Sequence, residues 1–391
     1  MAETVSRPLL DLYPNRGLIF TRGEGVHLYT RDGTPYLDLM TNYGVSILGH
    51  GHPAMLRAIG EQSERLITLH GSFGNEVRTR AAVALVERLG MGGASICWTN
   101  SGAEAIEAAL KFAAVAMGRT GFVACEGGYH GKTLGAQVVT HGARYREGLP
   151  ALLSNCRWAP FGDPEAIDAA IGIDTAAVVI EPIQGEGGIV VPPDGFLLAT
   201  AEVCRRRGVL LIVDEIQTGC GRTGAFTASG EAGIVPDILC LGKGLAGGIP
   251  VGATVVSSAV AVRVPRGAHT STFGGNPLAA AGVLAVLDAV NDELLTQVRE
   301  RGARFREGLT AVTRDWGLEV RGRGLMIGVV VGEGRDQVLK ALQRERVLAI
   351  PAGKDVVRFL PPYVAGEGDL TGAARAFETA LGRGVRMIPP A

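Results

Sequence analysis

The chain has 391 residues, and its 38 basic and 39 acidic side chains give a formal net charge of −1 at pH 7. This balance excludes the strong attraction to nucleic acid or anionic membrane that a markedly basic protein shows. The length allows one large domain and a smaller one, and no segment reaches the ~20 apolar residues of a membrane span. Since the N-terminus "MAETVSRPLL" lacks the charged-then-apolar pattern of a secretory signal, we expect a cytoplasmic protein.

Cysteine and lysine usage narrows the possible chemistry. The six cysteines form no CxxC pair and mostly lie in apolar segments, so we expect buried thiols in a reducing compartment and no bound metal. Lysine is rare, which leaves few candidates for lysine chemistry. The lysines are Lys111, Lys132, Lys243, Lys340 and Lys354.

The first part and the middle of the chain predict different structures. Residues 18–40 alternate apolar and polar side chains around "RDG", which is typical of an antiparallel hairpin. Further on, short apolar runs alternate with helical patterns, one opening at Ser101 and another covering 195–208. The predicted strands span 94–100, 120–126, 175–182, 209–215, 237–242 and 252–258. Because these runs are almost continuously apolar, we expect a mostly parallel sheet with helices on both faces.

The C-terminal part returns to shorter strands. The apolar run from Pro277 to Leu287 predicts a buried helix, and beyond residue 291 a helical stretch precedes "GLMIGVVV", "VVRFLPP" and a terminal helix. We therefore predict an α/β protein with a large central domain and a small domain assembled from both ends of the chain. The expected division is 1–45 and 291–391 for the small domain and 46–290 for the large one.

Lys243 stands between two glycines at the end of a predicted buried strand, in "LGKGL". A dry pocket lowers the pKa of a lysine, which becomes a nucleophilic amine suited to a Schiff base. The alternative is a lysine that keeps its charged head in water. The preceding strand ends at Asp214 and Glu215. A carboxylate there has a metal, a ligand cation or a protonated ring nitrogen as partner, or else caps a helix or forms a structural ion pair.

Two further loops follow strands and so belong to the same edge of the predicted sheet. In "TNSGAEA" a helix begins at Ser101, Gly102 and Ala103, whose free N–H groups suit a phosphate, although serine is also an ordinary N-cap. In "GGYHGKT" the strand is followed by Tyr129 and His130. An aromatic ring at this position either covers a flat ligand or belongs to the core.

The segment "GGYHGKT" also resembles a phosphate-binding Walker A loop, with "LLIVDE" as the matching Walker B strand. The pattern G-x-x-x-x-G-K-[ST] requires a glycine where this chain has Glu126. We therefore disfavour an ATP-binding P-loop protein.

A lysine for an aldehyde, a carboxylate for a pyridinium nitrogen and a helix start for a phosphate together describe a site for pyridoxal 5′-phosphate (PLP). Over nearly its whole length the chain resembles the class III, fold-type I aminotransferases, and within them most of all the acetylornithine and aminoadipate-semialdehyde enzymes. The matching segments include "RGEGVHLYTRDGTPYLDL", "NYGVSILGHGHP", "NSGAEA", "EPIQGEGG", "VDEIQTGCGRTG", "LGKGLAGGIPVGA" and "TSTFGGNPLA". The resemblance implies a mostly parallel seven-stranded sheet in the large domain and a small α+β domain from both termini.

The resemblance also implies how PLP would be held. Lys243 would carry PLP as a Schiff base, Asp214 would keep the ring nitrogen protonated, and Gln217 would hydrogen-bond the ring hydroxyl. Ser101, Gly102 and Ala103 would bind the phosphate, and Tyr129 would stack on the ring. His130 and Glu181 would orient Asp214 and its neighbours, and Thr272 would reach the phosphate of a neighbouring subunit. The last role implies a homodimer.

Five residues would contact substrate by the same resemblance. Arg358 matches the arginine that binds the substrate α-carboxylate, for which a guanidinium fork is better suited than an ammonium. Glu186 matches a gate residue that pairs with this arginine when the amine has no nearby carboxylate. Tyr13 and Tyr43 match the distal pocket, or else pack under the small domain. Lys132 replaces an arginine of acetylornithine-type relatives, so we expect altered binding of the dicarboxylate partner.

These residues predict a transaminase that moves an amino group from a terminal (ω) amine to 2-oxoglutarate, giving an aldehyde and glutamate. The amine would be N-acetylornithine or an analogue from lysine biosynthesis. A broad ω-amine transaminase and a PLP-dependent aminomutase stay open as alternatives, whereas a non-enzymatic binding protein is disfavoured because the polar positions of the site are intact. The expected partners are the amine donor, the 2-oxo acid and a second subunit, with neither nucleic acid nor membrane.

Overall fold

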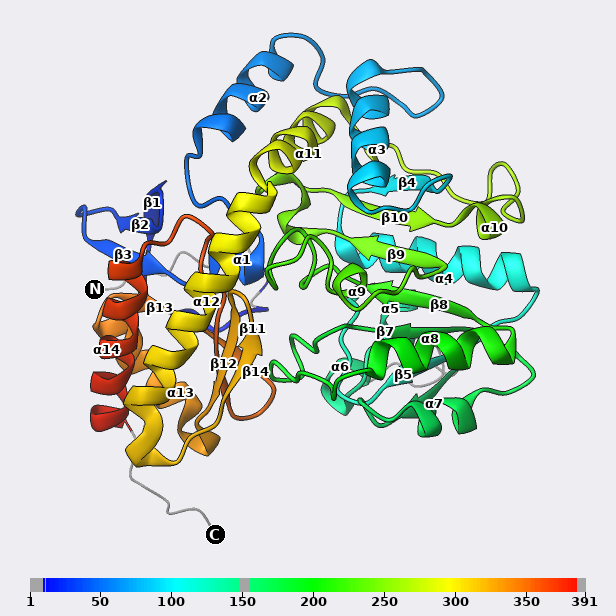
Figure 1. The fold of residues 1–391 in the computed structure, drawn as a ribbon. Helices are drawn as coiled ribbons and strands as arrows, with labels where there is room; N and C mark the ends of the chain where they lie inside the picture. Colours follow the sequence, from blue (N-terminus) through cyan, green and yellow to red (C-terminus); the bar gives the residue numbers. More distant parts are fainter. Residues whose placement is uncertain (1–9, 11, 148–154, 385–391) are drawn as a thin grey trace.

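The computed structural model describes residues 10, 12–147 and 155–384. In this part of the chain seven strands form the large sheet in the order β4-β10-β9-β8-β7-β5-β6 (Figure 1). They span Ser95–Thr99 (β4), Gly252–Val256 (β10), Ile238–Leu241 (β9), Leu210–Asp214 (β8), Thr175–Ile180 (β7), Gly121–Cys125 (β5) and Cys156–Ala159 (β6). Strands β5 to β9 run parallel, which confirms the mostly parallel sheet.

Strand β10 departs from the parallel arrangement because its connection is short. Residues 242–251 join it to β9, whereas a parallel crossover needs about a dozen residues or more. β10 is antiparallel to both β9 and β4, so the carboxyl end of β4 points the same way as those of the parallel strands. Five loops, after β4, β5, β7, β8 and β9, therefore meet at one edge of the sheet.

Helices cover both faces of this sheet, as its continuously apolar strands require (Figure 1). One layer contains α4 (Gly102–Met117), α5 (Leu134–Val138) and α10 (Ser258–Ala261). The other contains α7 (Pro164–Ala170) and α8 (Phe196–Arg207), and α9 (Ala228–Glu231) and α6 (Ala143–Arg146) are short turns between strands. At the top of Figure 1, α2 (Pro53–Ser63) and α3 (Glu76–Arg88) pack against α11 (Pro277–Ala289).

The small domain uses both ends of the chain, as predicted. Its first sheet joins the hairpin strands β1 (Phe20–Glu24), β2 (His27–Thr30) and β3 (Pro35–Asp38) to β13 (Val347–Leu348). Its second sheet contains β11 (Val320–Arg323), β12 (Met326–Val330), β15 (Val356–Phe359) and β14 (Ile350–Ala352). The helices α12 (Asp292–Thr313), α13 (Arg335–Arg344) and α14 (Glu367–Gly384) complete it, and a short turn, α1 (Thr41–Gly44), links it to the large domain.

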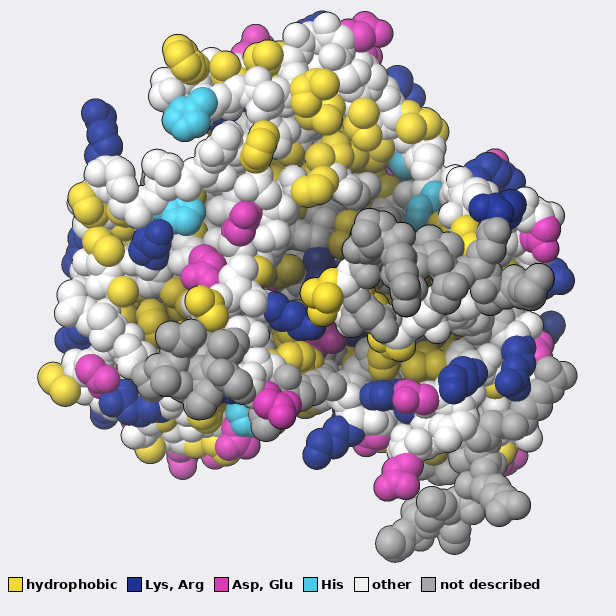
Figure 2. Space-filling view, turned by 180° about the vertical axis from the view of Figure 1, so that it is seen from behind, with side chains coloured by type: hydrophobic (Ala, Val, Ile, Leu, Met, Phe, Trp, Pro, Cys, Tyr) yellow, Lys and Arg dark blue, Asp and Glu magenta, His cyan; other side chains and the backbone are white. Residues whose placement is uncertain are grey.

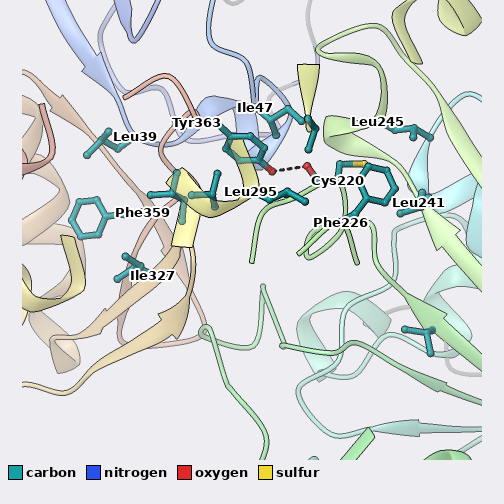
Figure 3. Close-up of a cluster of buried hydrophobic side chains, with 14 of the residues drawn as sticks. Leu39, Ile47, Cys220, Phe226, Leu241, Leu245, Leu295, Ile327, Phe359 and Tyr363 are labelled. Carbon is teal, nitrogen blue, oxygen red and sulfur yellow. Dashed lines mark hydrogen bonds between the residues drawn. The ribbon is translucent and has the colours of Figure 1, made fainter. Parts of the chain in front are cut away.

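The two domains share one apolar core. Figure 3 shows Tyr363 of the small domain beside Cys220 of the large domain, with Phe359 on the small-domain side of the cluster and Phe226 and Leu241 on the other. The Tyr363 hydroxyl donates to the carbonyl oxygen of Cys220 at 2.9 Å across this boundary. A fully buried side chain with a fixed hydrogen bond leaves little freedom for the domains to slide at this point.

All six cysteines are free thiols, four of them buried. None of the helices in the described ranges is both long and apolar enough to cross a lipid bilayer.

Candidate active site

Most of the residues singled out in the sequence lie on the loops that meet at the carboxyl edge of the large sheet. These residues are far apart in the chain, and they meet because the strands that precede them all end at this edge. The loops after β4, β5, β7, β8 and β9 carry, in that order, Ser101 to Ala103, then Tyr129 and His130, then Glu181 and Glu186, then Asp214 and Gln217, and finally Lys243.

Asp214 is buried at the end of β8 and is held by two donors. Its Oδ2 lies 2.7 Å from Nδ1 of His130, and its Oδ1 accepts the backbone N–H of Ile216 at 3.0 Å. Burial acts to lower the pKa of His130, but the hydrogen bond to Asp214 and the charges of Asp214 and Glu181 outweigh it and raise that pKa. A carboxylate has about four acceptor sites, so Asp214 keeps capacity for at least one further donor.

The neighbouring carboxylates have different tasks. Glu181 accepts the backbone N–H groups of Tyr129 at 3.0 Å and Gly185 at 3.1 Å, so it ties together the loops after β5 and β7 on one side of Asp214, and burial raises its pKa to about 7. Glu215 is directed to the protein interior instead, where it accepts from Thr218 and Ser229. Of the two acids that end β8, Asp214 is therefore the one directed to the site.

Lys243 begins the turn after β9 with a φ of +43°, a left-handed conformation that is unusual for lysine. A Cβ on the next residue, Gly244, would lie 2.7 Å from the Ile47 side chain, so only glycine fits there. Burial lowers the pKa of Lys243, and the charge of Arg358 lowers it further, against the opposing effect of the nearby acids. Lys243 is therefore a half-buried lysine whose surroundings favour the uncharged amine over the ammonium.

The N-terminus of α4 forms the other end of the site. Ser101 is its N-cap and accepts the N–H of Glu104 at 3.2 Å. Within the described residues no protein acceptor faces the N–H groups of Gly102 and Ala103. A Cβ on Gly102 would lie 2.8 Å from the side chain of Ile216, so this helix start sits against the loop that carries Asp214.

Arg358 lies fully buried on β15 and faces the same loops. Its Nη2 forms an ion pair with Glu186 at 2.7 Å and also donates to the carbonyl oxygen of Pro351, while its Nη1 donates to Oε1 of Gln217 at 3.0 Å. The guanidinium carbon lies 5.4 Å from the ring centroid of Tyr43. Because the amide oxygen of Gln217 is used by Arg358, its NH₂ group is the part left to bind a ligand.

Three of the predicted site residues stay apart from this network. Tyr13 is mostly exposed and lines a groove along α13 together with Tyr43. Lys132 is exposed, with its ammonium 5.8 Å from the ring centroid of Tyr145. Thr272 is exposed on the loop before α11, next to Ser271. No hydrogen bond or ion pair joins Tyr13, Lys132 or Thr272 to another predicted site residue within the described ranges.

The donor set of this edge fits PLP. The free N–H groups at the start of α4 suit a phosphate, the spare acceptor capacity of Asp214 suits a pyridinium N–H, and the amine of Lys243, with its lowered pKa, suits an aldehyde. The half-buried ring of Tyr129, whose pKa is raised to about 12 by burial and by Glu186, provides an uncharged aromatic surface beside them.

Comparison with known proteins shows the family to which the chain belongs. Residues 13–381 match the family model described as aminotransferase class-III, and the chain belongs to this family. It is 41% identical to the acetylornithine aminotransferase of Methanopyrus kandleri over 97% of this chain and 98% of the relative. It is 39% identical to the [LysW]-aminoadipate semialdehyde/glutamate semialdehyde transaminase of Sulfurisphaera tokodaii, over 94% and 95% of the two chains.

Solved structures agree on the fold. The ornithine aminotransferase of Toxoplasma gondii superposes with a TM-score of 0.91 at 32% identity, covering 96% of this chain and 93% of the other. A PLP-bound amine transaminase from an uncultivated Pseudomonas species gives a TM-score of 0.90 at 28% identity, covering 98% and 99%. The protein is therefore a fold-type I aminotransferase, an enzyme class that uses PLP.

Sequence reasoning alone missed several contacts that shape the site. Nδ2 of Asn100 donates to the hydroxyl of Ser271 at 3.1 Å, which ties the start of α4 to the loop that carries Thr272. Arg222 is fully buried and donates to the carbonyl oxygens of Leu325 and Pro361. Asn100 and Arg222 lie inside segments that resemble the family, "TNSGAEA" and "GCGRTG", but nothing in either pattern predicts the partner.

Proposed function

We propose that the enzyme transfers the terminal amino group of an ω-amine, such as N-acetylornithine or its analogue from lysine biosynthesis, to 2-oxoglutarate. The observation that carries this proposal is the placement of Lys243, a half-buried lysine with a lowered pKa, between the carboxylate of Asp214 and the free N-terminus of α4. The names of the relatives from Methanopyrus and Sulfurisphaera supply the substrate class.

In this proposal each residue of the sheet edge holds one part of PLP. Lys243 binds its aldehyde as a Schiff base, Asp214 its ring nitrogen, and the NH₂ group of Gln217 its ring hydroxyl. Tyr129 covers the ring, His130 and Glu181 keep Asp214 and the neighbouring loops in place, and the phosphate lies at the start of α4. The phosphate contacts come from Ser101, Gly102 and Ala103.

PLP supplies an electron sink that stabilises negative charge on the substrate carbon. With PLP in place, the amine of Lys243 would be the base that takes the proton from that carbon and the acid that delivers it to the carbon of the cofactor, and its lowered pKa favours the neutral amine that this requires. Asp214 keeps the ring nitrogen protonated. Arg358 binds the α-carboxylate of glutamate or 2-oxoglutarate, and Glu186 neutralises it when an ω-amine occupies the pocket.

We further propose a homodimer in which Thr272 reaches the phosphate bound by the partner. Figure 2 shows apolar side chains gathered over the upper part of the molecule, where α2, α3 and α11 lie. The large exposed apolar residues of α2, of α3, of the loop between them and of the loop before α11 are Leu56, Leu66, Ile67, Phe73, Val83 and Phe273. An apolar surface of this kind marks a protein interface. The division at residues 45 and 290 and the cytoplasmic location stay predictions.

A broad ω-amine transaminase is the second candidate. Two observations favour it: the likeness to the amine transaminase from Pseudomonas, and the exposed ammonium of Lys132, which lacks the planar fork of an arginine. Tyr13 and Tyr43 would then line a pocket for the body of the amine.

The first test compares the purified enzyme with its Lys243→Ala variant. The wild type should retain a visible absorbance band of bound PLP, and N-acetylornithine should bleach it faster than 1-phenylethylamine. Faster bleaching by the aryl amine favours the second candidate. Lys243→Ala should lose the band and at least about 10²-fold in turnover. A variant with the wild-type band and normal turnover rules out the assignment of Lys243.

A further inference from the structure

Arg222 is a fully buried arginine without an acidic partner. It is 1% exposed, and none of the described carboxylates lies within ion-pair distance. Its Nη1 donates to two carbonyl oxygens, of Leu325 at 3.0 Å and Pro361 at 2.5 Å, while Nε and Nη2 have no partner. Buried arginines are normally paired with acids because an uncompensated charge in the interior is costly. This unusual arrangement therefore calls for a role in placing the groups it binds.

The two carbonyl groups lie next to β15, the strand that carries Arg358, and to its partner β12. Leu325 immediately precedes β12, and Pro361 follows β15 three residues after Arg358. The two strands pair with each other, and Arg358 lies opposite Gly328 in the ladder. The N–H of Leu325 donates back to the carbonyl oxygen of Arg222 at 3.0 Å. The strands are antiparallel, so the start of β12 and the end of β15 lie side by side, and one side chain of the large domain holds both strands at this end of the pair that presents the substrate arginine.

The loop after β8 contains both Arg222 and Gln217, the residue that accepts a hydrogen bond from Arg358. Asp214 ends β8, Gln217 follows within the same loop and accepts from Arg358, and Arg222 comes five residues later. The guanidinium carbon of Arg222 lies 4.9 Å from the ring centroid of Tyr363, whose hydroxyl donates to Cys220 of this loop (Figure 3). The spacing between the cofactor loop and the substrate strand is therefore fixed by a small set of fully buried contacts.

We propose that Arg222 is a positioning residue that sets the place of Arg358 relative to the cofactor loop, and so determines how well the enzyme binds carboxylate-bearing substrates. This inference rests on the proposed role of Arg358 in binding the substrate carboxylate. Arg222 itself lies behind the site and contacts neither substrate nor PLP.

Binding of glutarate, an unreactive dicarboxylate, to the PLP-loaded enzyme tests the inference by isothermal titration. Arg222→Met keeps the apolar stem but removes both carbonyl contacts, so the Kd for glutarate should rise about tenfold or more. The KM for glutamate should rise by a similar factor, with kcat and bound PLP within about twofold of wild type. Arg222→Lys can still donate to both carbonyls but fits the Tyr363 ring less well, and should weaken glutarate by about two- to fivefold.

Arg301→Met is the matched control, because Arg301 also donates to a backbone carbonyl of this segment, that of Tyr363, but from α12. It should leave the Kd for glutarate within about twofold. Unchanged glutarate binding in Arg222→Met, or an equal loss in Arg301→Met, overturns the inference. If Arg222→Met does not fold, unchanged binding in Arg222→Lys overturns it. Arg358→Gln separates the two proposals: if it too leaves glutarate binding unchanged, the carboxylate role of Arg358 itself is wrong.

Discussion

Three titratable groups, Asp214, His130 and Glu181, are packed together at the cofactor edge of the sheet, each at least nine-tenths buried. Burial raises the pKa of Glu181 to about 7 from an ordinary 4.5. For His130 the contact with Asp214 overcomes burial, and its pKa is raised above the ordinary 6.5. Both groups therefore hold their protons more tightly in the folded protein than in the unfolded chain, which ties stability to pH.

We predict that the cofactor-free protein loses stability as pH rises through neutrality. The folded state keeps the proton of Glu181 up to about pH 7, whereas the unfolded chain releases it near 4.5, so the free energy of unfolding falls over this window. The contribution is up to about 3 kcal/mol. His130 acts in the same direction: its stabilisation is complete below pH 6.5 and is lost as pH rises through its raised pKa.

Urea unfolding at pH 5 and pH 8 measures this effect. Glu181→Gln should reduce the difference in unfolding free energy between the two pH values by roughly 1–3 kcal/mol, because the amide does not titrate. Glu126→Gln, at an exposed position near the same loop, should leave the difference unchanged. A wild-type protein equally stable at both pH values contradicts the prediction.

At the scale of the element, the turn α1 is the most strained part of the site. Thr41, Asn42 and Tyr43 all have positive φ values, of 44°, 51° and 60°, and Gly44 follows at 88°. A left-handed conformation costs an ordinary residue about 1–2 kcal/mol. The turn persists because Asp38 accepts the N–H of Thr41 at 2.9 Å and the Thr41 hydroxyl donates to the carbonyl of Leu360 at 2.8 Å.

We predict that Asn42 is important for stability although it is exposed. Asparagine tolerates the left-handed region better than alanine, so Asn42→Ala should destabilise the protein by about 1 kcal/mol, whereas Asn42→Gly should change its stability by less than about 0.5 kcal/mol. Arg57→Ala, on the exposed side of α2, controls for the loss of an exposed polar side chain. Chemical unfolding measures the stability of each variant. An Asn42→Ala variant as stable as Asn42→Gly contradicts the strain argument.

This turn also shows what the sequence could and could not predict. The strands before Ser101, Asp214 and Lys243 were predictable because each is a continuous apolar run, and the edge they share follows from their direction. Strand β6 was missed, since "CRWA" at the sheet edge is only half-buried and has no such run. The left-handed turn was not predictable, because contacts with Asp38 and with Leu360, more than 300 residues away, impose it.

The same limit applies to the site. Lys243 and Asp214 could be chosen from residue type and position, but Arg358 was assigned only by resemblance, because nothing local joins it to Gln217, 141 residues earlier. Contacts between the domains, such as those of Arg222, depend on how the small domain packs on the large one. Local patterns predict the elements, and tertiary packing decides which of their side chains meet.

At the scale of the whole molecule, the proposed homodimer makes each site depend on assembly, because Thr272 would contact the phosphate bound by the partner. Thr272 is exposed and lies beside Phe273, which is 59% exposed, on a loop that Asn100 and Ser271 tie to the start of α4. A stable dimer buries about 1,200–2,000 Å² of apolar-centred surface. A carboxylate introduced at Phe273 would be buried in such an interface without a partner, which is strongly unfavourable.

We predict that Phe273→Asp dissociates the dimer and weakens PLP binding together. The Kd for PLP should rise about tenfold or more, because the partner's phosphate contact is lost with the interface. Sedimentation velocity gives the assembly state, and titration of the cofactor-free protein with PLP gives the affinity. Ile173→Asp, at a 91% exposed apolar position before β7, should change neither. A Phe273→Asp variant that is monomeric yet binds PLP with wild-type affinity shows that each site is complete within one chain, whereas one that stays dimeric places the interface elsewhere.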